Sequence, residues 1–326
     1  MNSASTVIIT FLAVAATCAE AGAGGSGLIF VSNERGNTIS VLSGDHEVVA
    51  TMETCARPRG MHFSADRKQF YVGCADDNLI AIYDTATRKL AGRIRNVEEP
   101  ETFDLHPDGR HLYVSNEEDA AATVYDVTTG EQTGFYETGE EPEGVQATSD
   151  GKLVFVASEA ANLVHVIDVE AGEVIADILT DTRPRRFALN PEETELWVTA
   201  ELAGVVDIID IASLKIIETI TFLPRGFRKE EVTPVDLLIT KDGSRAYVAL
   251  GRANHVAVVD PKARKVLDYI LVGRRAWGLA LTSDEKLLYV ANGLSDDVSI
   301  IDTESRRVIT SVPVGLVPYG ILIDDR

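Results

Sequence analysis

Arginine, glutamate and aromatic residues recur at one position of the sequence, beside a motif that usually contains proline and glycine. In chain order the residues at this position are Arg59, Glu101, Glu143, Arg185, Val235, Trp277 and Tyr319. Arg274 and Arg275 lie three and two residues before the tryptophan. Guanidinium groups bind carboxylates through paired hydrogen bonds, and aromatic side chains stack on flat rings. Together these residues predict a binding site for a small anionic ligand.

Two residues earlier the same order of charges occurs, in Arg57, Glu99, Glu141 and Arg183. Opposite charges on adjacent repeats can neutralise each other, so the alternative is a neutral ring of ion pairs with a structural role.

A second group of candidate ligands is acidic. Glu117, Glu118 and Asp119 follow one apolar segment, and further acidic residues follow others: Asp76, Asp77, Glu159 and Glu201. Calcium and lanthanides favour such oxygen ligands, but the spacing matches no known metal loop, and a solvated acidic rim is the alternative. The sequence therefore assigns no metal.

Motifs for catalysis are not recognisable. The six histidines are scattered, and none has a zinc-binding spacing. The sequence also lacks a nucleophile elbow, a phosphate-binding loop, a dinucleotide fingerprint and a haem-attachment motif. We name no catalytic residue, leave enzymatic activity uncertain and favour a non-enzymatic role.

Seven repeated units position these side chains. Segments such as Leu112–Asn116 and Leu288–Asn292 recur with starts at residues 28, 70, 112, 154, 196, 246 and 288. Each unit contains four short apolar or alternating segments separated by turns, with no helical period. This pattern predicts an all-β, seven-bladed β-propeller. We expect the C-terminal strand, 319–324, to join the N-terminal strands in one composite blade, which closes the ring.

These segments, with the recurring Pro-x-Gly and Ser-Asp-Gly-Lys pieces, resemble the YVTN-repeat β-propeller family over the whole chain after residue 27. The layout is most similar to the PQQ-dependent catabolism-associated β-propeller proteins. That resemblance implies a periplasmic accessory of PQQ-dependent alcohol oxidation that binds a partner protein of the quinoprotein system or a small anionic ligand. It supplies no catalytic residues. PQQ, a planar tricarboxylate, would suit the predicted anion site, and calcium or a lanthanide would suit the group of acidic residues. None of them is assigned as a cofactor. A metal-assisted lactonase and a structural envelope or surface-layer propeller are the alternatives.

Charge and the first residues indicate where the protein works. The chain has 326 residues and a formal net charge of −21, which disfavours nucleic acid and anionic membranes as partners. Residues 7–19 form an uncharged apolar run, too short to span a bilayer, before an Ala-Glu-Ala sequence. We predict a signal peptide over 1–21, a flexible linker over 22–27 and the propeller over 28–326, in the periplasm without a membrane span. No basic residue precedes the run, which points to a misplaced start codon. A buried strand or helix is the alternative to a signal peptide.

Two local features complete the prediction. Cys55 and Cys74 should both reach the top of one blade, where a disulfide is one of two open outcomes. The fifth unit carries an insertion around residues 224–232, whose side chains would form a partner-binding loop or an inert surface loop. The residues expected to contact the partner are Arg225, Phe227, Arg228 and Lys229.

Overall fold

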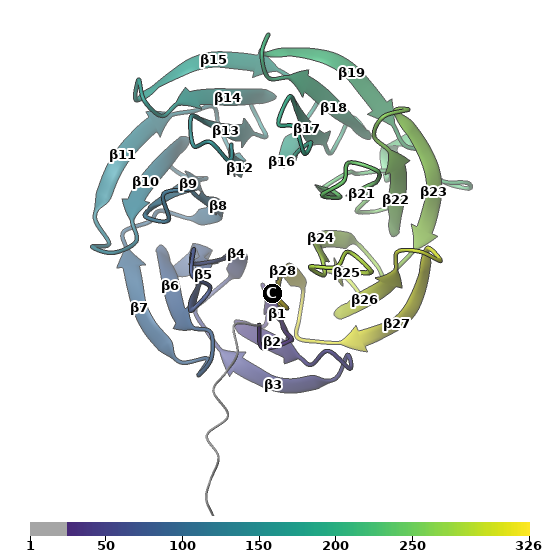
Figure 1. Cartoon of the computed structure of the whole chain (residues 1–326), viewed down its shortest axis with the longest axis horizontal. Coiled ribbons are helices and arrows are strands. Elements are labelled where there is room, and N and C mark those ends of the chain that lie inside the picture. The colour runs from purple at the N-terminus through teal and green to yellow at the C-terminus, as the bar shows by residue number, and fades with distance from the viewer. Residues whose placement is uncertain (1–24) are drawn as a thin grey trace, which may run out of the picture.

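The computed structural model describes residues 25–326, and these residues form a ring of seven four-stranded antiparallel sheets (Figure 1). The predicted all-β, seven-bladed propeller is confirmed. Within the described part the only helical elements are the 3₁₀ turns η1 (Ala75–Asp77) and η2 (Lys229–Glu231). No helix found there has the length and apolar character needed to cross a bilayer. The predicted signal peptide and the first half of the predicted linker, 22–24, lie outside the described residues.

Each blade is ordered from the channel outward, and the four strand positions have different burial. The innermost strands are β4 (Pro58–Phe63), β8 (Pro100–Leu105), β12 (Pro142–Ala147), β16 (Pro184–Leu189), β20 (Asp236–Ile239), β24 (Ala276–Leu281) and β28 (Pro318–Asp324). The second strands are β1 (Leu28–Asn33), β5 (Gln69–Cys74), β9 (His111–Asn116), β13 (Leu153–Ser158), β17 (Glu195–Ala200), β21 (Ala246–Ala249) and β25 (Leu287–Asn292).

The third strands are β2 (Thr38–Leu42), β6 (Leu79–Asp84), β10 (Ala121–Asp126), β14 (Leu163–Asp168), β18 (Val205–Asp210), β22 (His255–Asp260) and β26 (Asp297–Asp302). The rim strands are β3 (Val48–Glu53), β7 (Leu90–Arg95), β11 (Gln132–Glu137), β15 (Glu173–Leu179), β19 (Lys215–Thr221), β23 (Lys265–Leu271) and β27 (Arg307–Pro313). We number the blades from the composite blade, β28-β1-β2-β3, as blade 1, through β4–β7 as blade 2, to β24–β27 as blade 7.

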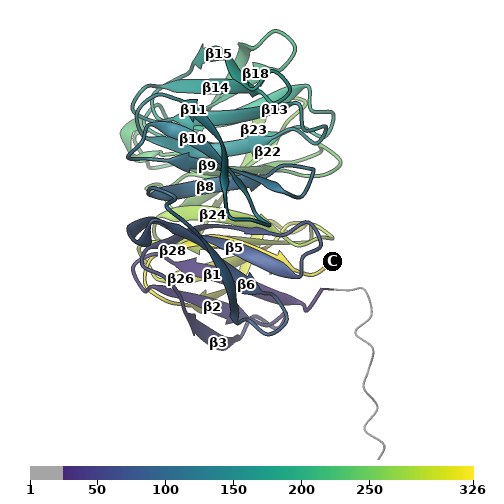
Figure 2. The same ribbon diagram turned by 90° about the vertical axis from the view of Figure 1, so that its left-hand side faces the viewer.

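The apolar segments of the repeat become the second and third strands, which are buried on both faces between neighbouring blades. The rim strands alternate between partly buried and exposed residues, because only one of their faces meets an adjacent blade. Large side chains such as Trp197, Phe155 and Tyr289 fill the spaces between blades. The side view shows the resulting disc (Figure 2).

Ring closure follows the predicted pattern. β28 pairs with β1, with Ile29 opposite Ile323 and Phe30 opposite Leu322. The carboxylate of Asp324 also accepts hydrogen bonds from the backbone N–H and the hydroxyl of Ser26, each at 2.8 Å. The last residues of the predicted flexible linker are therefore attached to the composite blade, because Ser26 fixes them there.

The inner strands approach one another closely at the channel, and this explains the recurring glycine. A Cβ atom on Gly144 would lie 1.9 Å from the carbonyl oxygen of Arg185, and one on Gly278 would lie 2.1 Å from that of Tyr319. Blades 5 and 6 have Arg186 and Asp236 at this position instead. These two charged residues narrow the channel below its mouth, which we define as the end where the inner strands begin.

Candidate binding site at the mouth of the channel

The mouth brings together the charged residues that the sequence singled out. Arg59, Glu101, Glu143 and Arg185 all lie on inner strands, and all four are buried. Arg59 forms an ion pair with Glu101 of the next blade. Arg185 pairs with Glu143, with 2.9 Å between Nη2 and Oε1. The pairings of the neutral-ring alternative are thus present, and the mouth is a continuous network of ion pairs.

Glu143 is the centre of this network. Its Oε1 accepts hydrogen bonds from the hydroxyl of Tyr319 at 2.8 Å and from Arg186 at 3.2 Å. Arg59 lies 3.5 Å from the same oxygen. Burial alone would raise the pKa of Glu143, but the charges of Arg185, then of Arg59 and Arg186, hold this pKa well below its usual value. Glu143 is therefore ionised, and its Oε1 is held by the surrounding arginines and Tyr319.

Two other carboxylates of the network behave in the opposite way. Burial, and next the charge of Glu143, raise the pKa of Glu101 well above its ordinary value. The same two causes, in the same order, raise the pKa of Glu159 to about 8, although two arginines contact it. A carboxyl with a pKa near 8 holds a proton over much of the neutral range. The network consequently carries less negative charge than its residue count suggests.

The two aromatic residues of the mouth are already covered by guanidinium groups. Arg185 and Arg275 lie over the ring of Trp277, 4.9 and 4.4 Å from its centroid. Arg59 lies 4.5 Å from the ring centroid of Tyr319, which is buried. These cation–π contacts stabilise the arginines in place. The two rings therefore hold arginine side chains in place, and this arrangement leaves them less suited to the predicted stacking on a flat ligand.

Above this network lies a cavity of about 320 Å³ with an almost wholly polar lining. Its lining includes Trp277 from the predicted set and arginines from blades 2, 5, 6 and 7: Arg57, Arg59, Arg183, Arg185, Arg252 and Arg275. The carboxylates that line it are Glu34, Glu117, Glu143, Glu159 and Glu201. Val235 is buried and does not reach it, and the exposed Arg274 is not part of it either.

The charges around the cavity are unevenly distributed. On the side of blades 4 to 7, four arginines contact or lie near three carboxyl groups: Arg183, Arg185, Arg252 and Arg275 with Glu143, Glu159 and Glu201. Because Glu159 is largely protonated at pH 7, these carboxyl groups supply fewer negative charges than the arginines supply positive ones. Burial first, then the neighbouring positive charges of Arg252, Arg185 and Arg183, lower the pKa of Arg275, although Glu201 opposes this. A crowded group of arginines with too few counter-charges favours an added anion.

The opposite side is acidic. Four carboxylates there surround Arg57 and Arg59: Glu34, Glu99, Glu101 and Glu117. Oxygens of Glu99, Glu101 and Glu117 lie within 4.8 Å of one another. Arg57 contacts the first two, so part of this cluster already has its counter-charge. Among the other predicted acidic residues, Glu118, Asp119, Asp76 and Asp77 are exposed.

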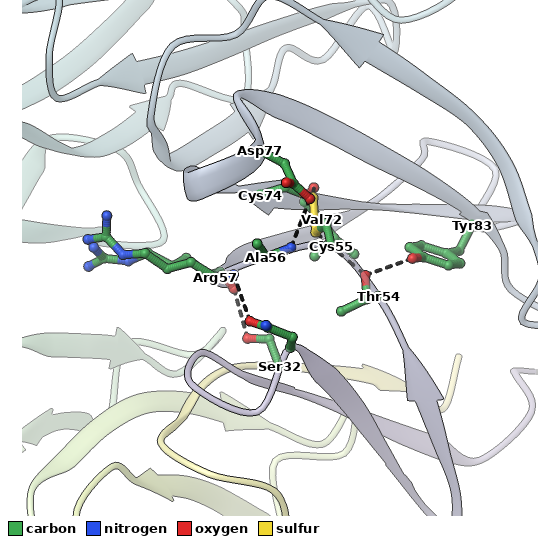
Figure 3. Close-up of a disulfide and its surroundings, with 11 residues drawn as sticks. Ser32, Thr54, Cys55, Ala56, Arg57, Val72, Cys74, Asp77 and Tyr83 are labelled. Atoms are coloured by element: carbon green, nitrogen blue, oxygen red, sulfur yellow. Dashed lines mark hydrogen bonds between the residues drawn. A yellow bond between two sulfur atoms is a disulfide. The ribbon is translucent and has the colours of Figure 1, made fainter.

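Cys55 and Cys74 form a disulfide beside the loop that carries Arg57, and Cys55 lies two residues before Arg57 (Figure 3). Their Cα atoms are 5.6 Å apart. The backbone N–H of Ala56 donates to the carboxylate of Asp77 at 2.9 Å, which attaches the loop to η1. Figure 3 shows Arg57 extending away from the disulfide. The cross-link therefore holds the loop that carries Arg57 into the network.

The insertion of the fifth unit is anchored to the propeller. Phe227 packs against the core between blades 5 and 6 and contacts the ring of His255 at a centroid distance of 5.4 Å. Arg228 pairs with Glu231 inside the loop at 3.3 Å. Arg225 and Lys229 are exposed. Of the four residues predicted to contact a partner, the three charged ones are exposed, whereas Phe227 faces the protein.

One arrangement was not visible in the sequence. Nδ1 of His165 lies 2.6 Å from the carboxylate of Asp177, and its Nε2 lies 3.0 Å from the hydroxyl of Ser158. This resembles a hydrolytic triad, but Ser158 is completely buried, and Nε2 already accepts a hydrogen bond from the backbone N–H of Gly139 at 2.8 Å. Asn292 and Ser299 form a similar polar contact at 2.9 Å in blade 7. The triad is therefore a structural set of hydrogen bonds that links neighbouring strands.

The sequence prediction also missed Glu34, Arg186 and Arg252. The position that yields Glu117, Glu159 and Glu201, just after the second strand, also yields Glu34 in blade 1. In blade 6 this position is Gly251, and Arg252 follows it. Arg186 replaces the recurring glycine. The repeat alignment contained both signals.

Comparison with known families matches two parts of the chain to propeller models. Residues 30–189 match the YNCE-like β-propeller model, and residues 176–309 match the lactonase, seven-bladed β-propeller model. The chain is a β-propeller. Each match covers less than half of it, and neither model concerns PQQ-dependent catabolism, so that narrower resemblance stays a prediction. No curated protein sequence matches this propeller significantly.

Solved structures share the fold. The propeller is similar to Kuenenia stuttgartiensis hydrazine synthase, with a TM-score of 0.73 and 23% identity over 81% of this chain and 88% of that one. It is also similar to the periplasmic gluconolactonase PpgL of Pseudomonas aeruginosa, with a TM-score of 0.77 and 19% identity over 91% and 98%. For the dihydro-heme d1 dehydrogenase NirN the values are 0.71 and 14% over 95% and 78%.

Proposed function

We propose that this propeller is a non-enzymatic periplasmic binding protein that holds a small organic anion in the cavity at the mouth, as an accessory to PQQ-dependent alcohol oxidation. The single observation that carries the binding role is the excess of arginine on one side of a concave polar cavity. The periplasmic setting and the link to alcohol oxidation are supported by the sequence resemblance and the leader-like first residues.

The residues proposed to hold the anion are Arg252 and Arg275. Arg252 is exposed and lines the cavity, and its guanidinium has no carboxylate partner among residues 25–326. Arg275 has one weak partner, Glu201 at 3.4 Å. Arg59 and Arg185, by contrast, are buried and already paired, so breaking their contacts would cost more than a ligand carboxylate returns. The anion therefore takes the outer pair of arginines.

Isothermal titration calorimetry tests this role with PQQ, calcium and lanthanum as separate probes. PQQ suits the arginines through its carboxylates, although the guanidinium groups over Trp277 leave little room for stacking. We expect PQQ to bind and the Arg252→Gln variant to lose about tenfold or more in affinity. Arg274→Gln is the matched control, because Arg274 is exposed and outside the cavity. Equal affinity for PQQ in the two variants would contradict the proposed site. Failure of all three probes to bind would contradict the proposed ligand class.

A second candidate function is hydrolysis of a lactone. The basic side of the cavity lies within residues 176–309, the segment that matches the lactonase model, and the fold resembles a periplasmic gluconolactonase. The buried Ser158 offers such a reaction no accessible nucleophile, so it would need a metal-activated water. Glucono-lactone hydrolysis measured with and without calcium decides this, and turnover abolished by Arg252→Gln would favour the enzyme.

A further inference from the structure

Two charged residues of the cavity lining lack a counter-charge. The carboxylate of Glu117, on blade 3, has no hydrogen bond or ion pair to a cationic side chain within the described residues. The guanidinium of Arg252, on blade 6, has no carboxylate partner there either. Most of the other charged residues that line the cavity are held by strong ion pairs, as Arg57 is by Glu34 at 3.2 Å and Arg185 by Glu143 at 2.9 Å.

These two residues stand on opposite sides of the mouth, because blades 3 and 6 face each other across the ring (Figure 1). Glu117 lies on the acidic side of the cavity, and Arg252 lies on the basic side. The acidic side has four carboxyl groups around two guanidiniums, and the pKa of one of them, Glu101, is raised. The basic side has four guanidiniums to three carboxyl groups, Glu143, Glu159 and Glu201, and Glu159 is largely protonated at pH 7. The cavity therefore has an electric field across it, directed from the basic side, which favours an anion, to the acidic side, which favours a cation.

We infer that the natural ligand is dipolar: a small organic molecule that carries an ammonium group toward Glu117 and a carboxylate toward Arg252. This inference rests on the proposed binding function and names the chemical class of its ligand. A singly charged anion would satisfy Arg252 and leave Glu117 uncompensated. A dipolar molecule satisfies both residues at once, since each of its ends meets the opposite charge in a partly enclosed polar site.

The acidic side favours an ammonium over a bare metal ion. Arg57 contacts both Glu99 and Glu101, so a divalent ion bound by these carboxylates and Glu117 would lie against a guanidinium. The repulsion between the two cations would weaken the binding of the ion. An ammonium group needs only the free carboxylate of Glu117, which lines the cavity directly. The volume of about 320 Å³ limits the ligand to a small molecule.

The test uses a series of straight-chain ω-amino acids, from 4-aminobutyrate to 8-aminooctanoate, with the unsubstituted carboxylic acids of the same lengths. Binding is followed through the fluorescence of Trp277, which lines the cavity, while the only other tryptophan, Trp197, is fully buried. We expect one length to bind best, and to bind about tenfold or more tightly than its matched acid.

The variants assign the two ends of the ligand. In Glu117→Gln the advantage of the amino acid over the acid should fall to within about twofold, with the affinity for the acid unchanged or improved. In Arg252→Gln both ligands should bind about tenfold or more weakly. Glu118→Gln is the matched control for the acidic side, because Glu118 is the exposed neighbour of Glu117 and does not line the cavity.

The outcomes separate this inference from the proposed function. Amino acids that bind no better than their matched acids would overturn the dipolar ligand but leave anion binding standing. An advantage that survives Glu117→Gln would also overturn it. If neither series nor PQQ binds, both the dipolar ligand and the binding function fail.

Discussion

At the scale of single residues, the mouth depends on one carboxylate. Glu143 receives hydrogen bonds from Arg185, Arg186 and Tyr319, and all of these groups are buried or nearly so. Removing its charge would leave buried guanidiniums without a counter-charge, which costs far more than the net worth of the pair.

We predict that Glu143→Gln lowers the free energy of unfolding by about 3–5 kcal/mol, measured by urea denaturation. The matched control is Glu141→Gln, two residues earlier, where the carboxylate is 45% exposed and 4.0 Å from its nearest guanidinium. This control should change stability by less than about 0.5 kcal/mol. Similar losses in the two variants would show that the network is not what holds the mouth together.

A second residue-scale prediction concerns His62, which lies below the mouth. Burial alone would lower its pKa, but the hydrogen bond and charge of Asp104, at 3.3 Å, raise it above the ordinary value of 6.5. The folded state thus binds a proton more tightly than the unfolded chain. The resulting stability is complete below pH 6.5 and is lost as the pH rises through the folded-state value. Urea denaturation across this range should show a decline that His62→Gln reduces; an identical pH profile in the variant would refute this role.

Glu159 gives the ligand site its own pH dependence. Because its pKa is raised to about 8, first by burial and next by Glu143, Glu159 is largely protonated at pH 7 and ionised at pH 9. Once ionised, it competes with a bound anion for the arginines of the basic side. Affinity for a carboxylate probe should therefore fall as the pH rises from 7 to 9, and calorimetry at these two values measures the change. In the Glu159→Gln variant the affinity for the probe should no longer fall between pH 7 and 9. An affinity of the native protein that stays constant over this range would contradict the role of Glu159.

At the scale of elements, the disulfide between the loop before β4 and the end of β5 fixes Arg57. The two cysteines are separated by 19 residues in sequence. Replacing both by serine should lower the free energy of unfolding by about 2–4 kcal/mol in urea denaturation, mainly because the unfolded chain is no longer cross-linked. A reductant should destabilise the native protein and leave the double variant unchanged. Equal sensitivity of the two proteins to the reductant would contradict this account.

The strands themselves could be predicted because each has a local signal. The recurring apolar and alternating segments define every blade, and Asp-Gly turns mark three of them, at Gly109, Gly151 and Gly243. Even the composite blade follows from the order of the repeated segments. The hydrogen-bonded group of Ser158, His165 and Asp177 could not be predicted. Its members lie on three successive strands and come together only through the register of strand pairing. Which charges lack an oppositely charged partner was equally invisible. Glu117 lies beside the carboxyl groups of Glu99 and Glu101 and not beside an arginine, and Arg252 has no carboxylate partner among the described residues.

At the scale of the whole molecule, the ring is held shut by one strand and one side chain. β28 supplies the inner strand of blade 1, and Asp324 ties Ser26 and Arg67 to it. A chain that ends at Val317 lacks this strand and exposes the edge of β1. We expect it to lose cooperative unfolding or to aggregate, as seen by thermal denaturation and size-exclusion chromatography. Asp324→Asn, which keeps the strand, should fold and lose only about 1–3 kcal/mol. A truncated chain as stable as the native one would disprove the closure.

The same ring creates the two ends of the channel. The end opposite the mouth has a cavity of about 630 Å³ that includes Phe63, Leu281 and Ile323 in its lining, whereas the mouth is lined almost wholly by charged groups. The network of Arg186, Tyr319 and Glu143 lies between them. The central claim is that a ligand anion binds at the mouth.

A crystal structure of the protein soaked with 6-aminohexanoate tests that claim most directly. The account predicts density for a carboxylate at about 3 Å from the guanidinium of Arg252 or Arg275, with the ammonium on the side of Glu117. Density only in the cavity at the other end of the channel, or an empty mouth at saturating ligand, would contradict it.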